Sequence, residues 1–431
     1  MSRPVHIVGG RVVDPSQGLD GPAAVLVIDG RIEAVGPDVE APDGADSIDA
    51  TGLTVSPGLI DVHVHLREPG GEHKETIATG SRAAVAGGFT TIWAMPNTDP
   101  PIDDPAAVGY VRAAGRAVRA SRVMPIGAAS IGQQGEKMTE IGELVAAGAV
   151  AVSDDGHPVH DSGLMRRLLE YTQTFDIPVL QHAEDPGLTP GGVMNEGPVA
   201  TALGLRGIPN AAEAGMVARD VLLSELTGGH LHVCHVSARQ SVDQLLWAKE
   251  RGIRVTAEVT PHHLLLTEEL VRGYNTQAKV NPPLRVEEDV EAVRQALIEG
   301  VIDIIATDHA PHHYDEKERE FDDAPFGING LETAFSLCMK ALVEPGHMTL
   351  SGLIDRMSCA PARIMGLDTG TLRPGAPADI VLYAADESWT VDPTRFYSRS
   401  RNTPLAGQVL PGRIKRTIVS GETRFEAEGD A

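Results

Sequence analysis

Residues 59–66 read LIDVHVHL, an apolar run that ends in two histidines separated by one residue. Side chains two positions apart on a β-strand point to the same face, so His63 and His65 are predicted to lie side by side. Apolar runs of this kind are typical of parallel strands that are buried on both faces. Seven later stretches repeat the pattern of an apolar run with a polar end: TTIWAMPN (90–97), RVMPIGAAS (122–130), AVAVSDDG (149–156), PVLQHAED (178–185), HLHVCHVS (230–237), RVTAEVTPHH (254–263) and IDIIATDHAPH (302–312).

Helical segments are predicted between these strands. Asp104 followed by Pro105 is typical of a helix N-cap and first helical position, and residues 286–300 carry apolar side chains at helical spacing. Eight strand-then-helix units fit a (β/α)₈ barrel, which typically has about 250 residues. We therefore predict an α/β fold in which residues 58–365 form a TIM-type barrel.

Both ends of the chain read as short strands and turns. VLVIDGRIEAVG (25–36) has two apolar runs around Asp29-Gly30, and GRIKRTIVSGETRF (412–425) turns at Ser420-Gly421; both patterns predict hairpins. Neither end has enough strands for a core of its own. Residues 1–57 and 366–431 are therefore predicted to form one small β-sandwich.

The composition excludes several classes of function. The chain of 431 residues has 36 basic and 60 acidic side chains, a formal charge of −24 that disfavours nucleic acids and anionic membranes as partners. Three scattered cysteines offer neither a disulfide framework nor a Cys-x-x-Cys zinc site. The chain shows no secretory leader and no apolar run of about 18 residues. We expect a cytoplasmic protein.

Polar residues at the strand ends are predicted to meet, because the strands of such a barrel carry the active site at their carboxyl ends. Taken singly, each has an ordinary structural explanation: two surface or core histidines at 63 and 65, a turn at 154–156, or a hydrogen-bonded strand end at His182. Together, imidazole and carboxylate without thiolate suit Zn²⁺ or a similar divalent ion. Cys234 points away from its neighbour His235 and is expected to be a small buried hydrophobe. The candidate ligands are His63, His65, Asp155, His182, His235 and Asp308.

Several motifs together resemble the amidohydrolase superfamily and, within it, the dihydroorotases of long-chain bacterial type. They are PGLIDVHVHLREPG (57–70), AMPNTDP (94–100), SDDG, QHAED, HVCHVS, EVTPHHL, KVNPPLR (279–285) and ATDHAPH. The resemblance implies that His63, His65 and Asp308 hold one metal ion, that His182 and His235 hold a second, and that Asp155 bridges them. Hydantoinases and dihydropyrimidinases bridge instead with a carbamylated lysine, and residues 145–160 contain no lysine.

The resemblance also implies a set of substrate contacts. Arg67 and Asn97 match positions that bind a substrate carboxylate, a role for which the planar guanidinium fork is well suited. Asn281 and His312 match groups that hold the ring amide, although Asn281 before Pro282 is also typical of an ordinary turn. Residues 313–330 match a mobile flap whose backbone at Phe326 and Gly327 touches the ring; a solvated loop is the alternative interpretation.

The implied reaction is the reversible hydrolysis of L-dihydroorotate to N-carbamoyl-L-aspartate in pyrimidine synthesis. Hydroxide on one or two Zn²⁺ ions attacks the ring amide, and Asp308 acts as the base. Two alternatives stay open: another cyclic amidase, such as a hydantoinase or allantoinase, or a non-catalytic scaffold for aspartate carbamoyltransferase. The sequence also leaves open a homodimer and an association of the active enzyme with that transferase.

Overall fold

Eight parallel strands close into a barrel in the computed structural model, which describes residues 3–428. A parallel bridge between Val64 and His309 joins the last strand to the first and completes the ring. The strands are shorter than the predicted runs, and all eight are present, so the predicted (β/α)₈ barrel is confirmed. They are β8 (Leu59–Val64), β9 (Phe89–Ala94), β10 with β11 (Arg122–Pro125 and Gly127–Ala128), β12 (Val152–Ser153), β13 (Val179–Gln181), β16 (Leu231–Val233), β17 (Val255–Val259) and β18 (Ile304–Ile305).

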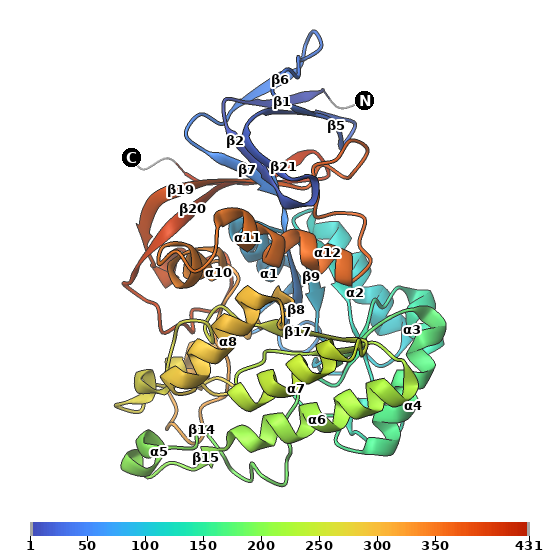
Figure 1. Ribbon diagram of the computed structural model, residues 1–431, viewed down its shortest axis with the longest axis vertical. Coiled ribbons are helices and arrows are strands. Elements are labelled where there is room, and N and C mark those ends of the chain that lie inside the picture. The colour runs from blue at the N-terminus through green and yellow to red at the C-terminus, as the bar shows by residue number, and fades with distance from the viewer. Residues whose placement is uncertain (1–2, 429–431) are drawn as a thin grey trace.

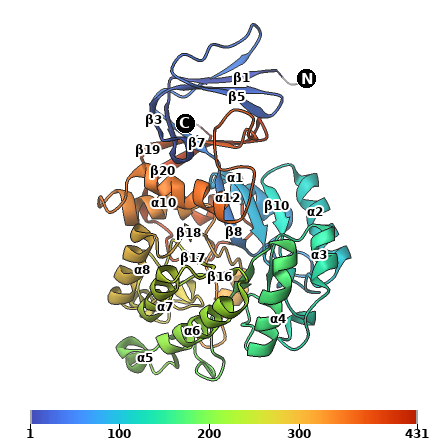
Figure 2. The same ribbon diagram turned by 45° about the vertical axis from the view of Figure 1, so that its right-hand side comes forward.

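Helices follow the strands and surround the barrel (Figure 2). Asp104 caps α2 by accepting hydrogen bonds from the backbone of Ala106 and Ala107, with Pro105 in the first turn, as predicted. The predicted helix at 286–300 is α8, which ends at Gly300 with a φ of 83°. The helices of the barrel are α1 (Ile77–Ala86), α2 (Pro105–Val118), α3 (Ile141–Ala147), α4 (Ser162–Thr172), α6 (Asn210–Thr227), α7 (Arg239–Glu250), α8 (Glu287–Glu299), α10 (Ala334–Cys338), α11 (Leu350–Ile354) and α12 (Ala360–Ile364).

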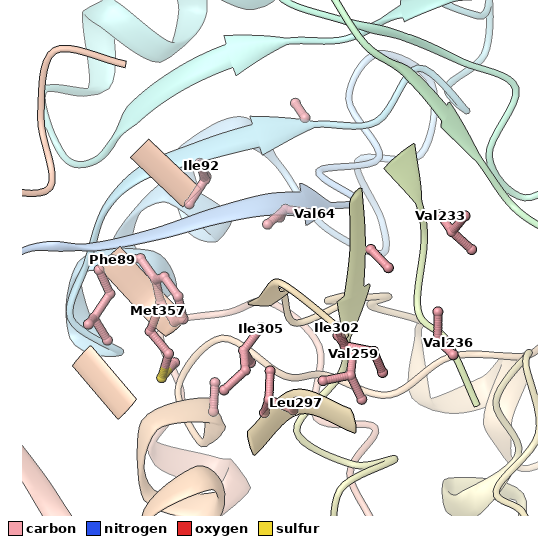
Figure 3. Packing of buried hydrophobic residues seen from close by; sticks show 14 of the residues in the cluster. Val64, Phe89, Ile92, Val233, Val236, Val259, Leu297, Ile302, Ile305 and Met357 are labelled. Atoms are coloured by element: carbon pink, nitrogen blue, oxygen red, sulfur yellow. The ribbon is translucent and has the colours of Figure 1, made fainter. Parts of the chain in front are cut away.

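The main core lies between the strands and the helices that cover them. Figure 3 shows Val259 and Ile305 of two neighbouring strands beside Leu297 of α8, and all three side chains are buried. Each such aliphatic side chain contributes roughly 1.5–3 kcal/mol when it leaves water. Burial on both faces explains why the strands read as nearly continuous apolar runs.

The two ends of the chain combine in one β-sandwich, as predicted. Strands from both ends share the larger sheet, in which β19 pairs antiparallel with β7, and both described chain ends lie at the sandwich end of the molecule (Figure 1). Asp29-Gly30 and Ser420-Gly421 have positive φ at both residues, the backbone of a tight hairpin turn. The sheets are β5-β4-β1-β6 (Arg31–Gly36, Ala24–Ile28, Val5–Val8, Asp46–Asp49) and β21-β20-β19-β7-β2-β3 (Glu422–Glu426, Val409–Val419, Ile380–Thr390, Thr54–Pro57, Arg11–Asp14, Leu19–Pro22).

The connection between β19 and β20 leaves the sandwich and reaches the barrel. The Asn402 side chain accepts a hydrogen bond from the backbone N–H of His312 at 3.0 Å. Its amide donates to the carbonyls of Ala310 at 2.9 Å and Gly327 at 3.0 Å. A segment assigned to the sandwich thus supports the loops that follow β18. The domain bounds of 1–57 with 366–431 and 58–365 stay a prediction, and their outermost residues, 1–2 and 429–431, lie outside the described part of the chain.

Smaller elements complete the loops above the barrel: β14 (Met194–Asn195), β15 (Gly207–Ile208), α5 (Pro198–Leu203) and α9 (Tyr314–Lys317). Within residues 3–428, no helix combines the length and the apolar character that a bilayer span requires.

Candidate metal centre

A cavity of about 700 Å³ lies between the barrel and the C-terminal strands, but the predicted site residues gather elsewhere, around a cavity of about 440 Å³ at the carboxyl ends of the barrel strands. His63 lies beneath the second cavity and is fully buried. The position agrees with the usual location of active sites in such barrels. The predicted residues that line it are His65, Arg67, Asn97, Asp155, His182, His235, Asn281, Asp308, His312, Phe326 and Gly327.

Asp155 lies between two pairs of histidines just after β12. Its Oδ2 is 3.3 Å from Nε2 of His63 and 3.4 Å from Nε2 of His65. Its Oδ1 is 3.4 Å from Nε2 of His235 and 3.5 Å from Nδ1 of His182. Each carboxylate oxygen therefore faces one histidine pair, which is the arrangement that a bridging ligand requires.

Asp308, at the end of β18, completes the group around the first histidine pair. Its Oδ1 is 3.0 Å from Nε2 of His65 and 3.5 Å from Nε2 of His63. Within the described chain, the ligand atoms of His63, His65 and Asp308 lie within 4.8 Å of one another, as do those of His63, Asp155 and His235. The Nε2 of His63 and the Oδ1 of Asp155 are buried and have no hydrogen-bond partner. Buried unpaired atoms in a set of imidazoles and carboxylates fit a divalent cation.

Burial and neighbouring charges set the protonation states of these ligands. Burial alone raises the pKa of Asp155, but the positive charge of His63 and the close approach of other histidines hold it well below its ordinary value. Burial also raises the pKa of Asp308, and the contact with His65 and the charges of nearby histidines lower it by more. Burial lowers the pKa of His65. Both carboxylates are ionised, which is the form that binds a metal ion. Burial lowers the pKa of His63, but the negative charges of Asp155 and Glu258 raise it well above its ordinary value, so a metal ion would displace a proton from this imidazole.

Asn97 has a contact that the sequence did not predict. Nδ1 of His65 lies 2.7 Å from Oδ1 of Asn97, so the imidazole donates to the amide oxygen and directs Nε2 toward Asp155 and Asp308. Asn97 also lines the cavity. One side chain can therefore orient a ligand histidine and still offer an N–H to a bound molecule.

Several of the predicted substrate-binding residues lie together on one wall of the cavity. Arg67 has a backbone φ of 59°, and its side chain donates from Nε to the carbonyl of Pro311 at 3.3 Å. Nε2 of His312 is 2.8 Å from the carbonyl of Phe326. At Gly327, where φ is 148°, a Cβ atom would lie 2.5 Å from the carbonyl oxygen of Ala310. A side chain at this position would therefore displace the wall, which explains the glycine.

Asn281 lies at the rim of the second histidine pair. Its Nδ2 is 3.4 Å from Nε2 of His182, and its Oδ1 has no hydrogen-bond partner. The side-chain oxygen and nitrogen of an amide are assigned from their neighbours, and exchanging them would let Oδ1 accept from His182. In either orientation Asn281 lines the cavity, so it is more than a turn residue before Pro282.

The loop of residues 313–330 packs against the cavity through two buried lysines. Nζ of Lys317 donates to the carbonyls of Lys279 at 3.1 Å and Pro325 at 2.8 Å. Nζ of Lys279 donates in turn to the carbonyls of Phe321 at 2.6 Å and Asp322 at 3.1 Å. Burial lowers the pKa of Lys317 to about 7. This loop is thus a packed wall in the structure, and its movement as a flap stays a prediction.

Some strand-end residues lie outside the cavity, and some cavity residues were not predicted. Nε2 of His309 contacts Glu75 at 3.2 Å, and Nε2 of His263 lies 3.0 Å from the carbonyl of Pro282. Cys234 belongs to a buried apolar cluster, and burial raises the pKa of its thiol, but its sulfur also lies within 4.8 Å of ligand atoms of His63 and Glu258. The unpredicted lining residues are Gly156, His157, Val280, Ala310 and Pro325. They are mostly small or apolar and carry no sequence signal of a site.

Solved structures of cyclic amidases share the fold. The L-hydantoinase (dihydropyrimidinase) from Arthrobacter aurescens superposes with a TM-score of 0.88 at 25% identity, covering 99% of this chain and 96% of the other. The D-hydantoinase (dihydropyrimidinase) from a Thermus species gives a TM-score of 0.84 at 26% identity, covering 97% and 94%. Both are barrels of the amidohydrolase type with an attached β-sandwich.

Sequence comparison separates this chain from those amidases. A family model described as dihydro-orotase-like matches residues 52–241. A dihydroorotase from Geobacter metallireducens is 51% identical over 420 residues, covering 97% of this chain and 99% of the relative. Another from Anaeromyxobacter dehalogenans is 53% identical over 430 residues, covering 99% of each. The barrel, its cluster of candidate metal ligands and this similarity along the whole chain agree, and the chain belongs to the dihydroorotase family.

Proposed function

We propose that this protein catalyses the reversible hydrolysis of L-dihydroorotate to N-carbamoyl-L-aspartate. The observation that carries the proposal is the position of Asp155, whose two oxygens face the two histidine pairs at 3.3–3.5 Å. An aspartate here distinguishes the site from the hydantoinase type, in which a carbamylated lysine bridges. Identity of 51% and 53% to dihydroorotases, against 25% and 26% to the hydantoinases, supports the same choice.

Asp308 is the proposed proton carrier. Divalent ions at this site supply charge that polarises a carbonyl and makes a water molecule more acidic. The carboxylate of Asp308 lines the cavity and is ionised, so it accepts the proton of the attacking water. As the ring C–N bond breaks, the same carboxyl returns the proton to the leaving nitrogen, which becomes the terminal NH₂ of the carbamoyl group. In ring closure Asp308 removes that proton again.

Arg67 and Asn97 are proposed to bind the substrate carboxylate. Both line the cavity beside the first histidine pair, and a guanidinium with an amide N–H offers donors without a competing negative charge. His312, whose Nε2 lies 3.4 Å from Arg67, is proposed to contact the ring amide together with Asn281, which lies beside His182, and the backbone at Phe326 and Gly327.

Two Zn²⁺ ions per chain are the proposed cofactors. Imidazole nitrogens and carboxylate oxygens suit zinc, and Asp155 gives each histidine pair its own oxygen. Chelation should abolish activity, and Zn²⁺ should restore it. A cytoplasmic location, a homodimer and an association with aspartate carbamoyltransferase stay predictions.

A substrate comparison tests the proposal. The purified chain is assayed for hydrolysis of dihydroorotate, hydantoin and allantoin, with metal analysis before and after chelation. Metal-dependent turnover that is fastest for dihydroorotate is the expected result. Faster turnover of hydantoin or allantoin would identify another cyclic amidase, and an inactive metal-loaded chain would identify a scaffold.

A further inference from the structure

Glu258 lies at the base of the metal centre, within β17, and is fully buried. Its Oε1 is 2.6 Å from Nδ1 of His63 and accepts the backbone N–H of His235 at 3.3 Å. One carboxylate oxygen therefore contacts a ligand from each histidine pair. Its Oε2 is 3.1 Å from Nε2 of His232. Glu258 does not line the cavity, so it acts on the site only through other residues.

A continuous hydrogen-bonded chain extends from Glu258 away from the cavity. Nδ1 of His232 is 2.8 Å from the hydroxyl of Thr256, and the same hydroxyl is 2.8 Å from Nε2 of His230. The ionised carboxylate accepts from His232 Nε2–H, so Nδ1 of that ring is free to accept from the hydroxyl of Thr256. That hydroxyl oxygen in turn accepts from His230. Each proton in the chain therefore has one donor and one acceptor.

The direction of this chain decides how His63 meets a metal ion. Because Nδ1–H of His63 donates to Glu258, Nε2 is the nitrogen that would give up its proton to a metal ion, and it faces Asp155 and Asp308. The two histidines of this pair have different hydrogen-bond acceptors: His63 donates to the carboxylate of Glu258, and His65 donates to the neutral amide of Asn97. A negatively charged partner increases the basicity of an imidazole ligand more than a neutral one does.

We propose that Glu258 is a positioning residue that fixes the tautomer and orientation of His63 and strengthens its bond to the first metal ion. The inference rests on the proposed metal centre and adds a residue outside the set of ligands. It explains why a carboxylate is retained inside an apolar strand, where a buried charge without partners would be strongly unfavourable.

Zinc binding by the variant Glu258→Gln tests the proposal. Glutamine keeps the size and one acceptor oxygen of glutamate but loses the charge. The dissociation constant for Zn²⁺ alone, measured by competition with a chelating dye, should rise by about 10–100-fold. Asp379→Asn is the matched control: Asp379 is a buried carboxylate at the junction with the sandwich, bonded to Arg122 at 2.8 Å and Thr369 at 2.9 Å. It should bind zinc as the wild type does.

A second readout uses the unmodified sequence and does not depend on whether the variant folds. In the zinc-loaded protein labelled with ¹⁵N-histidine, His63 should show a proton on Nδ1 with the far-downfield shift of a strong hydrogen bond to a carboxylate. In Glu258→Gln this resonance should move upfield. Unchanged zinc affinity in Glu258→Gln, or a zinc-loaded wild type whose His63 lacks the Nδ1 proton, would overturn the proposal. If Glu258→Gln binds zinc more weakly and His63 of the wild type carries the Nδ1 proton, but the wild type does not turn over dihydroorotate, then only the proposed function is refuted.

Discussion

Replacing Asp155 with asparagine tests whether this carboxylate bridges two ions. In the structure each oxygen serves one histidine pair, at 3.3 Å from His63 and 3.4 Å from His235. Asparagine keeps the shape and one carbonyl oxygen, but it removes the negative charge between the two ion positions. The variant Asp155→Asn should therefore lose the ability to hold two ions and not merely bind them at altered distances.

Coulomb's law gives the scale of the effect. Two divalent ions about 4 Å apart repel by roughly 16 kcal/mol at an effective dielectric constant of about 20. The single negative charge of the carboxylate is shared by two oxygens, one about 2.1 Å and the other about 4 Å from a given ion, and together they attract that ion by roughly 12 kcal/mol. Desolvation removes much of both terms, yet losing only a quarter of the attraction, about 3 kcal/mol, weakens the binding of the second ion more than about 100-fold.

The assay is a count of zinc ions per chain after loading and dialysis. The wild type should retain two and Asp155→Asn at most one. Asp154→Asn is the control, because the neighbouring carboxylate is also buried but binds the backbone N–H of Ser130 at 2.9 Å and contacts no ligand histidine. It should retain two ions. Two ions in Asp155→Asn would refute the bridging role, and a single ion in the wild type would refute the two-ion site.

Three further predictions concern single side chains. Asp308→Asn should lower kcat by at least about 100-fold with an unchanged circular dichroism spectrum, and substantial remaining turnover would exclude Asp308 as the proton carrier. Arg67→Ala should raise KM for dihydroorotate about 10–100-fold, the equivalent of a charged hydrogen bond; an unchanged KM would remove Arg67 from the site. Burial raises the pKa of Glu332 to about 8, so this carboxyl stays protonated in the folded chain while it ionises in the unfolded chain above its ordinary pKa of about 4.3. The free energy of unfolding should therefore fall between about pH 4.5 and 8, by at most about 5 kcal/mol, since the adjoining cavity admits water. Glu332→Gln should remove this decline in urea unfolding series, and parallel curves for both proteins would contradict it.

The fold was predictable because barrel strands are marked locally. Each apolar run with a polar end identifies a strand and the face that its last residues occupy, so His63, His182 and Asp308 could be placed at one site without knowing any contact. The same reasoning did not show which of Asp154 and Asp155 is a ligand, because both are aspartates at the end of the same strand. In the structure the two adjacent side chains point to different partners: Asp154 binds Ser130, and Asp155 faces the histidines.

Contacts between distant strands were not predictable in this way. Glu258 meets His63 because β17 and β8 are alternate strands of the closed ring, separated by β18, and alternate strands contribute to the same interior layer. The sequence signal was a single carboxylate within an apolar strand. Lys317 gave the opposite signal, because it lies in a highly charged stretch that is typical of a solvated loop. Only the carbonyls of Lys279 and Pro325 make its burial possible.

The acidity of the chain and the anionic nature of its proposed substrate are reconciled by the position of the charges. The formal charge of −24 is spread over the whole chain, and at physiological salt surface charges are screened beyond about 8 Å. Within the cavity, Asp155 and Asp308 outweigh Arg67 by one negative charge, and the positive charge of His63 beneath it offsets that difference, so the protein groups alone offer a carboxylate little attraction. Two divalent ions make the site positive. Metal binding therefore creates the positive field that an anionic substrate needs, as well as the chemistry that opens its ring, and both depend on the histidines that Glu258 and Asn97 hold in place.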